Sequence, residues 1–189
     1  MQWMFLGCSS LQSIDLSMFD TGNVTNMNML FSGCHNLNGL DLSNWDTSNV
    51  TDMSYAFEGC MNLERLNISS FTSENLQNIN GMLGYTYKLS AIDMGDFDMT
   101  NLSSQILYET AKNTPQCYIR CSQQTKNIIE NNNYVAKIIW ITDGSAMPDN
   151  ISSREEGLYY STDYSKDKTV RVVQQASIGR GIDLVLMGD

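Results

Sequence analysis

Apolar residues recur along the first half of the chain at intervals of 26 positions. The clearest copies are LQSIDLSMFDTGNVTNM at residues 11–27 and LNGLDLSNWDTSNVTDM at residues 37–53. The apolar columns in register are Cys8, Cys34 and Cys60; Leu11, Leu37, Leu63 and Leu89; Ile14, Leu40, Leu66 and Ile92; Leu16, Leu42, Ile68 and Met94; Phe19, Trp45, Phe71 and Phe97; and Val24, Val50, Leu76 and Leu102. This register predicts stacked repeats, in which each unit buries its apolar face against its neighbours.

Each unit divides into two predicted elements. Apolar residues alternate with polar ones around Leu40 and Leu42, which indicates a short, half-buried strand. The second part, SNVTDMSYAFEGC at residues 48–60, places apolar side chains at spacings of 3, 4 and 3, which predicts an amphipathic helix. The polar run at residues 46–49 would cap that helix at its start, and Gly59 would end it.

These elements predict an α/β fold with about four 26-residue repeats over residues 1–104. Stacking would form a parallel sheet on one side and a row of helices on the other. The first repeat is truncated, because Met1 aligns with Met27 in the middle of a unit. We therefore expect the chain to be part of a longer protein.

The 26-residue period is lost after the repeats. Residues 105–144 predict a C-terminal cap of strand, helix and strand: TPQCYIRCS, then a helix with Ser122 as N-cap, then YVAKIIWIT closed by Asp143-Gly144. Residues 145–189 predict a polar linker and a small β-rich tail, which would be the start of a following domain. No stretch is long and apolar enough to span a membrane.

The repeat columns match the general pattern of leucine-rich repeats. The form C-x-x-L-x-x-L-D-L-S-x-W-D-T-S-N-V-T-x-M at residues 34–53 resembles the BspA-like leucine-rich repeats of bacterial surface proteins, over about residues 1–104. Units three and four depart from it, since Asn67 and Thr72 replace aspartates and Thr86 replaces the cysteine. The resemblance implies a leucine-rich repeat solenoid in a cell-surface or secreted protein used in adhesion or protein contact.

The tail carries a second, shorter resemblance. GIDLVLMGD at residues 181–189 is similar to the opening strand of IgA-peptidase-type zinc metallopeptidases. Such enzymes need an H-E-x-x-H helix to hold zinc, and His35 is the sole histidine of this chain. The resemblance implies an alternative function, the accessory region of a metallopeptidase whose catalytic domain begins near Ile182. A structural spacer is a further alternative.

Charge restricts the classes of partner. The chain has a net charge of −10, and residues 1–112 hold twelve acidic against three basic side chains. Such a surface repels phosphate, so we expect no nucleic-acid binding. The sequence also lacks a Gly-rich phosphate loop and a nucleophile paired with a base, so we expect no enzymatic activity and no cofactor.

The five cysteines predict free, buried thiols. Cys8, Cys34 and Cys60 share one inward column, and Cys117 and Cys121 share one strand face. The odd number argues against a disulfide framework, and we expect no metal site. Asn-x-Ser/Thr strings occur at Asn23, Asn49, Asn67, Asn101 and Asn150, and we interpret the three at the starts of predicted repeat helices as helix caps.

Two more columns differ in their expected role: the aromatic column packs in the core, and the aspartate column faces outward. Phe19, Trp45, Phe71 and Phe97 predict a buried aromatic ladder. Asp15, Asp41, Asn67 and Asp93 lie between inward residues, so they point out of the sheet about 5 Å apart. Their mutual repulsion needs compensation, either through hydrogen bonds and solvent or through a weak cation or a basic partner.

We therefore expect a non-enzymatic binding or adhesion module that recognises a protein partner through the outward face of the sheet. The residues that this hypothesis places on the face are Ser13, Asp15, Gly39, Asp41, Arg65, Asn67, Ala91 and Asp93.

Overall fold

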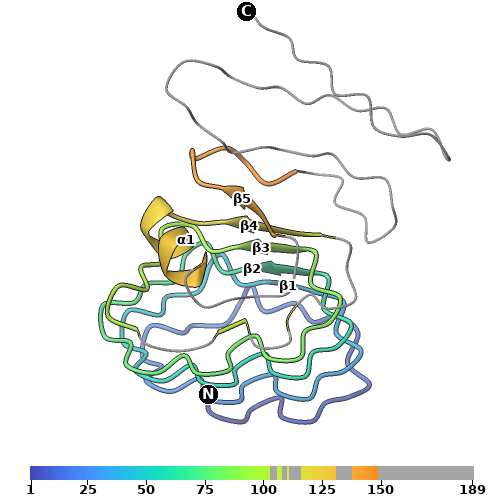
Figure 1. The fold of residues 1–189 in the computed structure, drawn as a ribbon. Helices are drawn as coiled ribbons and strands as arrows, with labels where there is room; N and C mark the ends of the chain where they lie inside the picture. Colours follow the sequence, from blue (N-terminus) through green and yellow to red (C-terminus); the bar gives the residue numbers. More distant parts are fainter. Residues whose placement is uncertain (103–105, 108–109, 111–115, 131–137, 149–189) are drawn as a thin grey trace, which may run out of the picture.

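The structure, a computed structural model, describes residues 1–102, 106–107, 110, 116–130 and 138–148. Successive coils of the chain stack on one another and form one parallel, five-stranded sheet whose strands follow in chain order (Figure 1). The strands are β1 (Gly39–Asp41), β2 (Arg65–Asn67), β3 (Ala91–Asp93), β4 (Cys117–Arg120) and β5 (Ile138–Ile141). The predicted parallel sheet is confirmed.

The strands pair in the register that the repeat predicts. Leu40 lies opposite Leu66, and Leu66 lies opposite Ile92, so each partner is 26 residues away. These central side chains are buried because successive side chains of a strand point to opposite faces. Residues 13–15 of the first coil form no strand, which corrects the prediction for that unit; the bond from Asn38 N to Gln12 O is 3.1 Å long.

The predicted repeat helices are wrong. Residues 47–50 form one turn, Asp52 forms a bridge to the neighbouring coils, and residues 53–60 form consecutive turns. Bonds from Ala56 N to Met53 O (3.1 Å) and from Cys60 N to Phe57 O (3.2 Å) close these later turns. Tyr55 and Gly59 occupy the third position of these turns with φ of 57° and 70°. Type II turns need such values, whereas a right-handed helix excludes them.

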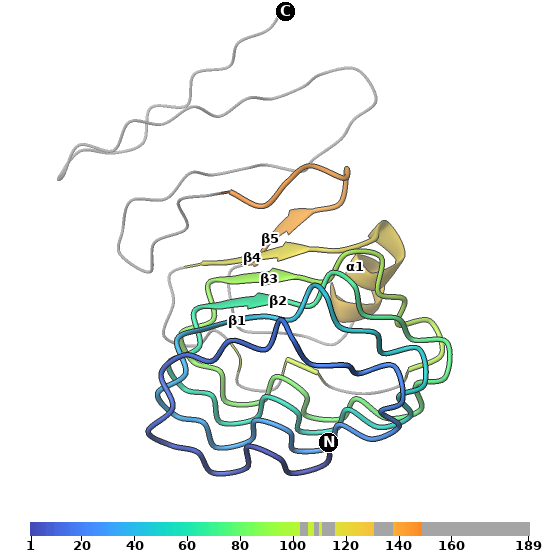
Figure 2. The same cartoon turned by 180° about the vertical axis from the view of Figure 1, so that it is seen from behind.

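The hydrogen bonds that would build a helix join neighbouring coils instead. The N–H groups of Met53, Tyr55, Phe57 and Gly59 donate to Asn78, Asn80, Met82 and Gly84 of the next coil, over 2.8–2.9 Å. Opposite the sheet, the described coils therefore present ladders of turns, seen from behind in Figure 2. The inward spacing of 3, 4 and 3 is produced by turns, and it imitates a helical face.

Because the repeats contain no such helices, the asparagines predicted as helix caps do not cap helices. Asparagines at this corner of the coil bond to the preceding coil instead. Asn49 Nδ2 donates to Gly22 O at 2.8 Å, and Asn75 Nδ2 donates to Ser48 O at 2.6 Å. Each bond reaches the preceding coil. The side chains therefore tie adjacent coils together at the corner between sheet and turns.

The core lies between the sheet and the turn ladders. The predicted burial of the aromatic column is confirmed for Trp45, Phe71 and Phe97. Phe19 is half-buried, and its ring stacks on Trp45 at 6.4 Å between centroids. A second ladder joins Phe31 to Phe5 and Phe57 at 4.9 and 5.9 Å. Sequence reasoning missed it because the corresponding positions had been assigned to a helix.

The predicted cap elements are present. Helix α1 (Gln123–Glu130) connects β4 to β5, and Ser122 Oγ accepts a bond from Thr125 N at 3.1 Å, as an N-cap does. Thr125 Oγ1 also donates to Phe97 O at 2.6 Å and ties the helix to the last repeat. The predicted tail at 149–189, including the metallopeptidase-like string, lies outside the described residues.

All five cysteines are free, but their burial differs from the prediction at one position. Cys34, Cys60, Cys117 and Cys121 are buried, whereas Cys8 is exposed. Among the described residues, no coil covers the first one, so its end of the thiol column is open. Burial raises the pKa of Cys34 to about 11, with Cys8 nearby adding to the shift, and burial raises the pKa of Cys117 and Cys121 to about 12.

Native thiol reactivity should follow this burial. At neutral pH we expect iodoacetamide to modify Cys8 rapidly, and the other four thiols only after unfolding, because the thiolate is the nucleophile. The raised pKa values also mean that the neutral thiols stabilise the fold below the ordinary value of 9.0. This contribution is lost as the pH rises through the folded values. Mass spectrometry of the native protein checks the first expectation, and rapid modification of a second cysteine would contradict it.

Candidate functional site

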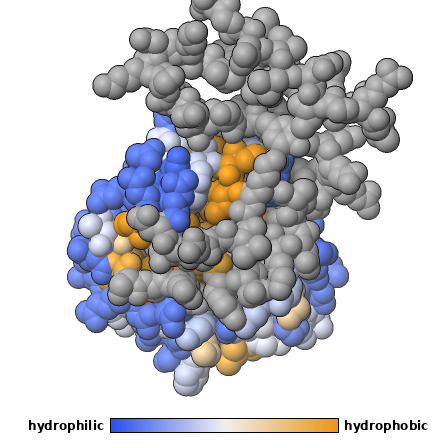
Figure 3. Space-filling view, viewed as in Figure 1, coloured by the Kyte–Doolittle hydropathy of each residue, from blue (hydrophilic) through white to orange (hydrophobic). Residues whose placement is uncertain are grey.

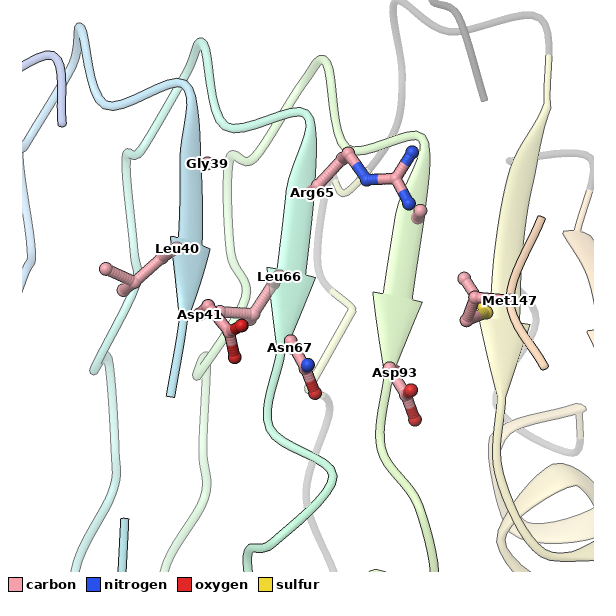
Figure 4. A pocket seen from close by; sticks show the side chains of 9 residues that line it. Gly39, Leu40, Asp41, Arg65, Leu66, Asn67, Asp93 and Met147 are labelled. Atoms are coloured by element: carbon pink, nitrogen blue, oxygen red, sulfur yellow. The ribbon is translucent and has the colours of Figure 1, made fainter. Parts of the chain in front are cut away.

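A hollow of about 420 Å³ opens on the outward face of the sheet (Figure 4). It is lined by Gly39, Leu40, Asp41, Arg65, Leu66, Asn67, Ala91, Asp93 and Met147. Six of the eight residues predicted for this face therefore line one hollow. Ser13 and Asp15 are exposed on the first coil and are not part of the lining.

The sheet register arranges the lining in two rows. Gly39, Arg65 and Ala91 are register partners, and so are Asp41, Asn67 and Asp93. The space over Gly39 is open, because a Cβ built there would approach only Arg65 O, at 3.8 Å. The hollow therefore extends over Gly39, which has no side chain to fill this part of it.

Ala91 does not have the exposed position predicted for it. Only 3% of its surface is exposed, because it lies between the longer side chains of its register partners Arg65 and Tyr118. Figure 4 shows the Arg65 side chain extending toward β3. Ala91 therefore shapes the floor of the hollow and offers little contact surface to a partner.

The column of Asp15, Asp41, Asn67 and Asp93 makes the same local bond in each coil. Oδ1 of Asp15, Asp41 and Asp93 accepts the N–H group two residues further on, over 3.0 Å in each case, and Asn67 Oδ1 does the same over 3.1 Å. For Asp15 the bonds from Ser17 lower the carboxyl pKa. Hydrogen bonding, one of the two compensations expected for this column, is therefore present.

An ion pair also offsets part of the repulsion between the carboxylates of this column. Arg120 on β4 contacts Asp93 at 2.7 Å from Nε to Oδ1, and Asn67 carries no charge. Sequence comparison between the repeats could not find Arg120, because it lies 27 residues after Asp93, in the cap. Asp41 has no ion-pair partner among the described residues, and it is exposed.

The one cation lining the hollow points away from Asp41. Arg65 Nη2 donates to Pro148 O at 3.4 Å, in the segment that follows β5. Figure 4 shows its guanidinium on the side of β3, with Asp41 on the opposite side of β2. Asp41 therefore presents a negative charge to the open space over Gly39.

Met147 is the lining residue that sequence analysis missed. It packs against a small apolar cluster formed by Tyr118, Ile139 and Ile141, on the outward side of β4 and β5. The turn at Asp143-Gly144 was predicted and is present, with Gly144 at φ of 79°. Nothing in the polar string at residues 145–148 showed that the chain then returns to the sheet.

A second hollow, of about 400 Å³, lies at the corner of the third and fourth coils, between residues 69–74 and 96–102. Glu74, Asp96 and Asp98 line it, and bonds from Thr100 lower the pKa of Asp98. Within the described part of the chain, no three His, Cys, Asp or Glu side chains converge as metal ligands would.

Comparison with known families assigns the repeat region. The family described as "Mycoplasma protein of unknown function, DUF285" matches residues 1–118. The chain belongs to the DUF285 family. The DUF285 match contains β1, β2 and β3 and all the lining residues of the first hollow except Met147.

Other comparisons add no relative. No curated protein and no solved structure matches the chain. In the described residues, no helix has the length and apolar character needed to cross a membrane.

Proposed function

We propose that the chain is a non-enzymatic binding module of a cell-surface or secreted protein, which recognises a protein partner through the hollow on the outward sheet face. The observation that carries the proposal is that eight residues from three consecutive coils line one open hollow, and six of them were predicted for the outward face. Three of these lining residues, Asp41, Asn67 and Asp93, form a polar row in strict register.

We also propose that the stack is a short solenoid of the leucine-rich-repeat type, similar to the BspA-like surface proteins. The leucine columns, the 26-residue register and the parallel sheet support this assignment. The turn ladders opposite the sheet depart from the helices expected for it. The resemblance to BspA-like surface proteins supports a location at the cell surface or outside the cell.

The charges favour a partner segment with a basic side chain. Asp93 is neutralised by Arg120, whereas Asp41 has no cationic partner among the described residues. Residues 1–112 carry a net charge of −9, so the wider field also attracts cations. A lysine or arginine entering the space over Gly39 would reach the Asp41 carboxylate.

Selection of short peptides from a random phage-displayed library against the full chain tests this function. We expect the selected peptides to be enriched in Lys or Arg, and their affinity to fall with rising salt. Asp41→Asn should weaken binding by about fivefold, the upper range for an exposed ion pair. Gly39→Leu should abolish binding by filling the hollow, and no backbone strain is expected because Gly39 does not have a positive φ.

Asp20→Asn is the matched control. Asp20 is exposed and its Oδ1 accepts the Gly22 N–H at 3.2 Å, so it makes the same local bond as Asp41 and carries the same charge away from the hollow. We expect this variant to bind as the unmodified chain does. Equal effects of Asp41→Asn and Asp20→Asn, or a library without basic enrichment, would reject the proposal.

A further inference from the structure

Arg65 is the only cation in the lining of the hollow, and its guanidinium is weakly held. Among the described residues it makes one hydrogen bond, from Nη2 to Pro148 O, over 3.4 Å. That distance exceeds the usual range of about 2.7–3.2 Å for an N–H···O bond. A guanidinium carries several N–H donors, so most of those on Arg65 have no acceptor in the described part of the chain. The end of this exposed side chain is therefore available to a partner.

No described carboxylate neutralises the charge of Arg65. Asp93, on the adjacent strand, is already paired with Arg120 over 2.7 Å. Asp41 lies on the opposite side of β2 from the guanidinium, as Figure 4 shows. The hollow therefore contains a positive and a negative group that do not pair with each other.

The hollow presents three chemistries in a fixed order across the sheet. Asp41 lies on β1, the guanidinium of Arg65 lies on the β3 side of β2, and Met147 lies beside β4 (Figure 4). Neighbouring strands are about 4.8 Å apart, so the span from Asp41 to Met147 is roughly 14 Å. In an extended segment, side chains at positions i, i+2 and i+4 point to one face and span roughly 13 Å. An extended segment that crosses the strands therefore matches the three groups.

The surroundings of the hollow make the single cation distinctive. Residues 1–112 hold three basic against twelve acidic side chains, so an acidic group of a partner is repelled over most of this surface and attracted to Arg65. Hydrophilic residues also dominate the described surface on the side drawn in Figure 3, where apolar residues are confined to a few areas. Charged contacts are therefore the main basis for recognition.

We propose that the hollow takes an extended segment of a protein partner with a basic, an acidic and an apolar side chain at alternate positions. The basic side chain pairs with Asp41, the acidic one replaces Pro148 O on the Arg65 guanidinium, and the apolar one packs on Met147. A carboxylate binds a guanidinium more strongly than a carbonyl does, because the bond is charge-assisted and can be bidentate. The inference rests on the proposed function and deepens it, with Arg65 as a specificity-determining residue.

Charge exchange at Arg65 tests the inference, with the full chain and peptides selected from the random phage-displayed library. We expect these peptides to carry Asp or Glu two positions from Lys or Arg. By isothermal titration calorimetry, replacing that acid with its amide should weaken binding to the unmodified chain by about fivefold, the upper range for an exposed ion pair. The same replacement should not change binding to Arg65→Gln. Arg65→Glu should reverse the preference, so that a peptide with lysine in place of the acid binds this variant more tightly than the selected peptide does.

Lys88→Gln is the matched control, because Lys88 is exposed, carries the same charge and lies outside the lining. Replacing the peptide acid should weaken binding to this variant by the same factor of about five. Basic peptides without an acidic residue, or an equal loss with the unmodified chain and with Arg65→Gln, would overturn the inference while leaving the proposed function in place. A library without basic enrichment would reject both.

Discussion

Replacing Trp45 with alanine should lower the free energy of unfolding by about 3–5 kcal/mol, the usual cost of removing a large buried aromatic side chain. Trp45 is 1% exposed, and its ring stacks on Phe19 at 6.4 Å between centroids. It fills the corner of its coil between neighbours above and below. The coils cannot move together to close the cavity, because this would break the hydrogen-bond ladders on both sides. We therefore expect the loss of unfolding free energy to fall within this range of about 3–5 kcal/mol.

Trp3→Ala is the control for this prediction. The Trp3 side chain is 55% exposed, and its Nε1 donates to Asn28 Oδ1 at 2.9 Å. Its loss should cost no more than about 1 kcal/mol, the net value of one exposed hydrogen bond. Urea unfolding of both variants measures the difference. Similar costs for the two substitutions would show that Trp45 is not a core residue.

Gly95→Ala should destabilise the protein by about 2–5 kcal/mol, which combines backbone strain with overpacking. Gly95 has a φ of 53°, a conformation that L side chains rarely adopt. A Cβ there would also lie within 3.1 Å of Ser69 C and closer still to Ser69 O. The obstructing atoms belong to the backbone of the preceding coil, so no side-chain rotation relieves the contact.

Gly144→Ala separates the two causes. Gly144 has a φ of 79°, but a Cβ there meets nothing within 4 Å. Only the strain remains, so the expected cost is about 1–2 kcal/mol. If Gly95→Ala costs no more than Gly144→Ala, the close approach of the coils at Ser69 is not as the structure describes it.

The sheet could be predicted because the same pattern of inward and outward residues recurs in successive repeats. Leu40, Leu66 and Ile92 recur at one spacing, each followed by a polar residue, and the alternation along the strand predicts which residues face outward. This was enough to place six residues of the hollow. The aromatic ladder through Trp45 followed from the same register.

The opposite side could not be predicted from spacing alone. Met53, Phe57 and Cys60 face inward at helical intervals, and the decisive feature was the positive φ of Tyr55, a residue type that gives no signal for it. Inter-coil hydrogen bonds outweigh the local helical preference because every second N–H finds an acceptor in the next coil. Arg120 and Met147 escaped prediction because they come from the cap, outside the repeat register.

We propose that a protein partner binds at the hollow over Gly39 and Asp41. The most direct measurement is the change in backbone amide NMR shifts of the full chain when a selected basic peptide is added. We expect the largest shift changes at Gly39, Asp41, Arg65 and Asn67, and no change at Asp20 or in the turn ladder near Tyr55. Changes concentrated on the turn ladder or on the first coil, with the β1 and β2 amides unmoved, would contradict it.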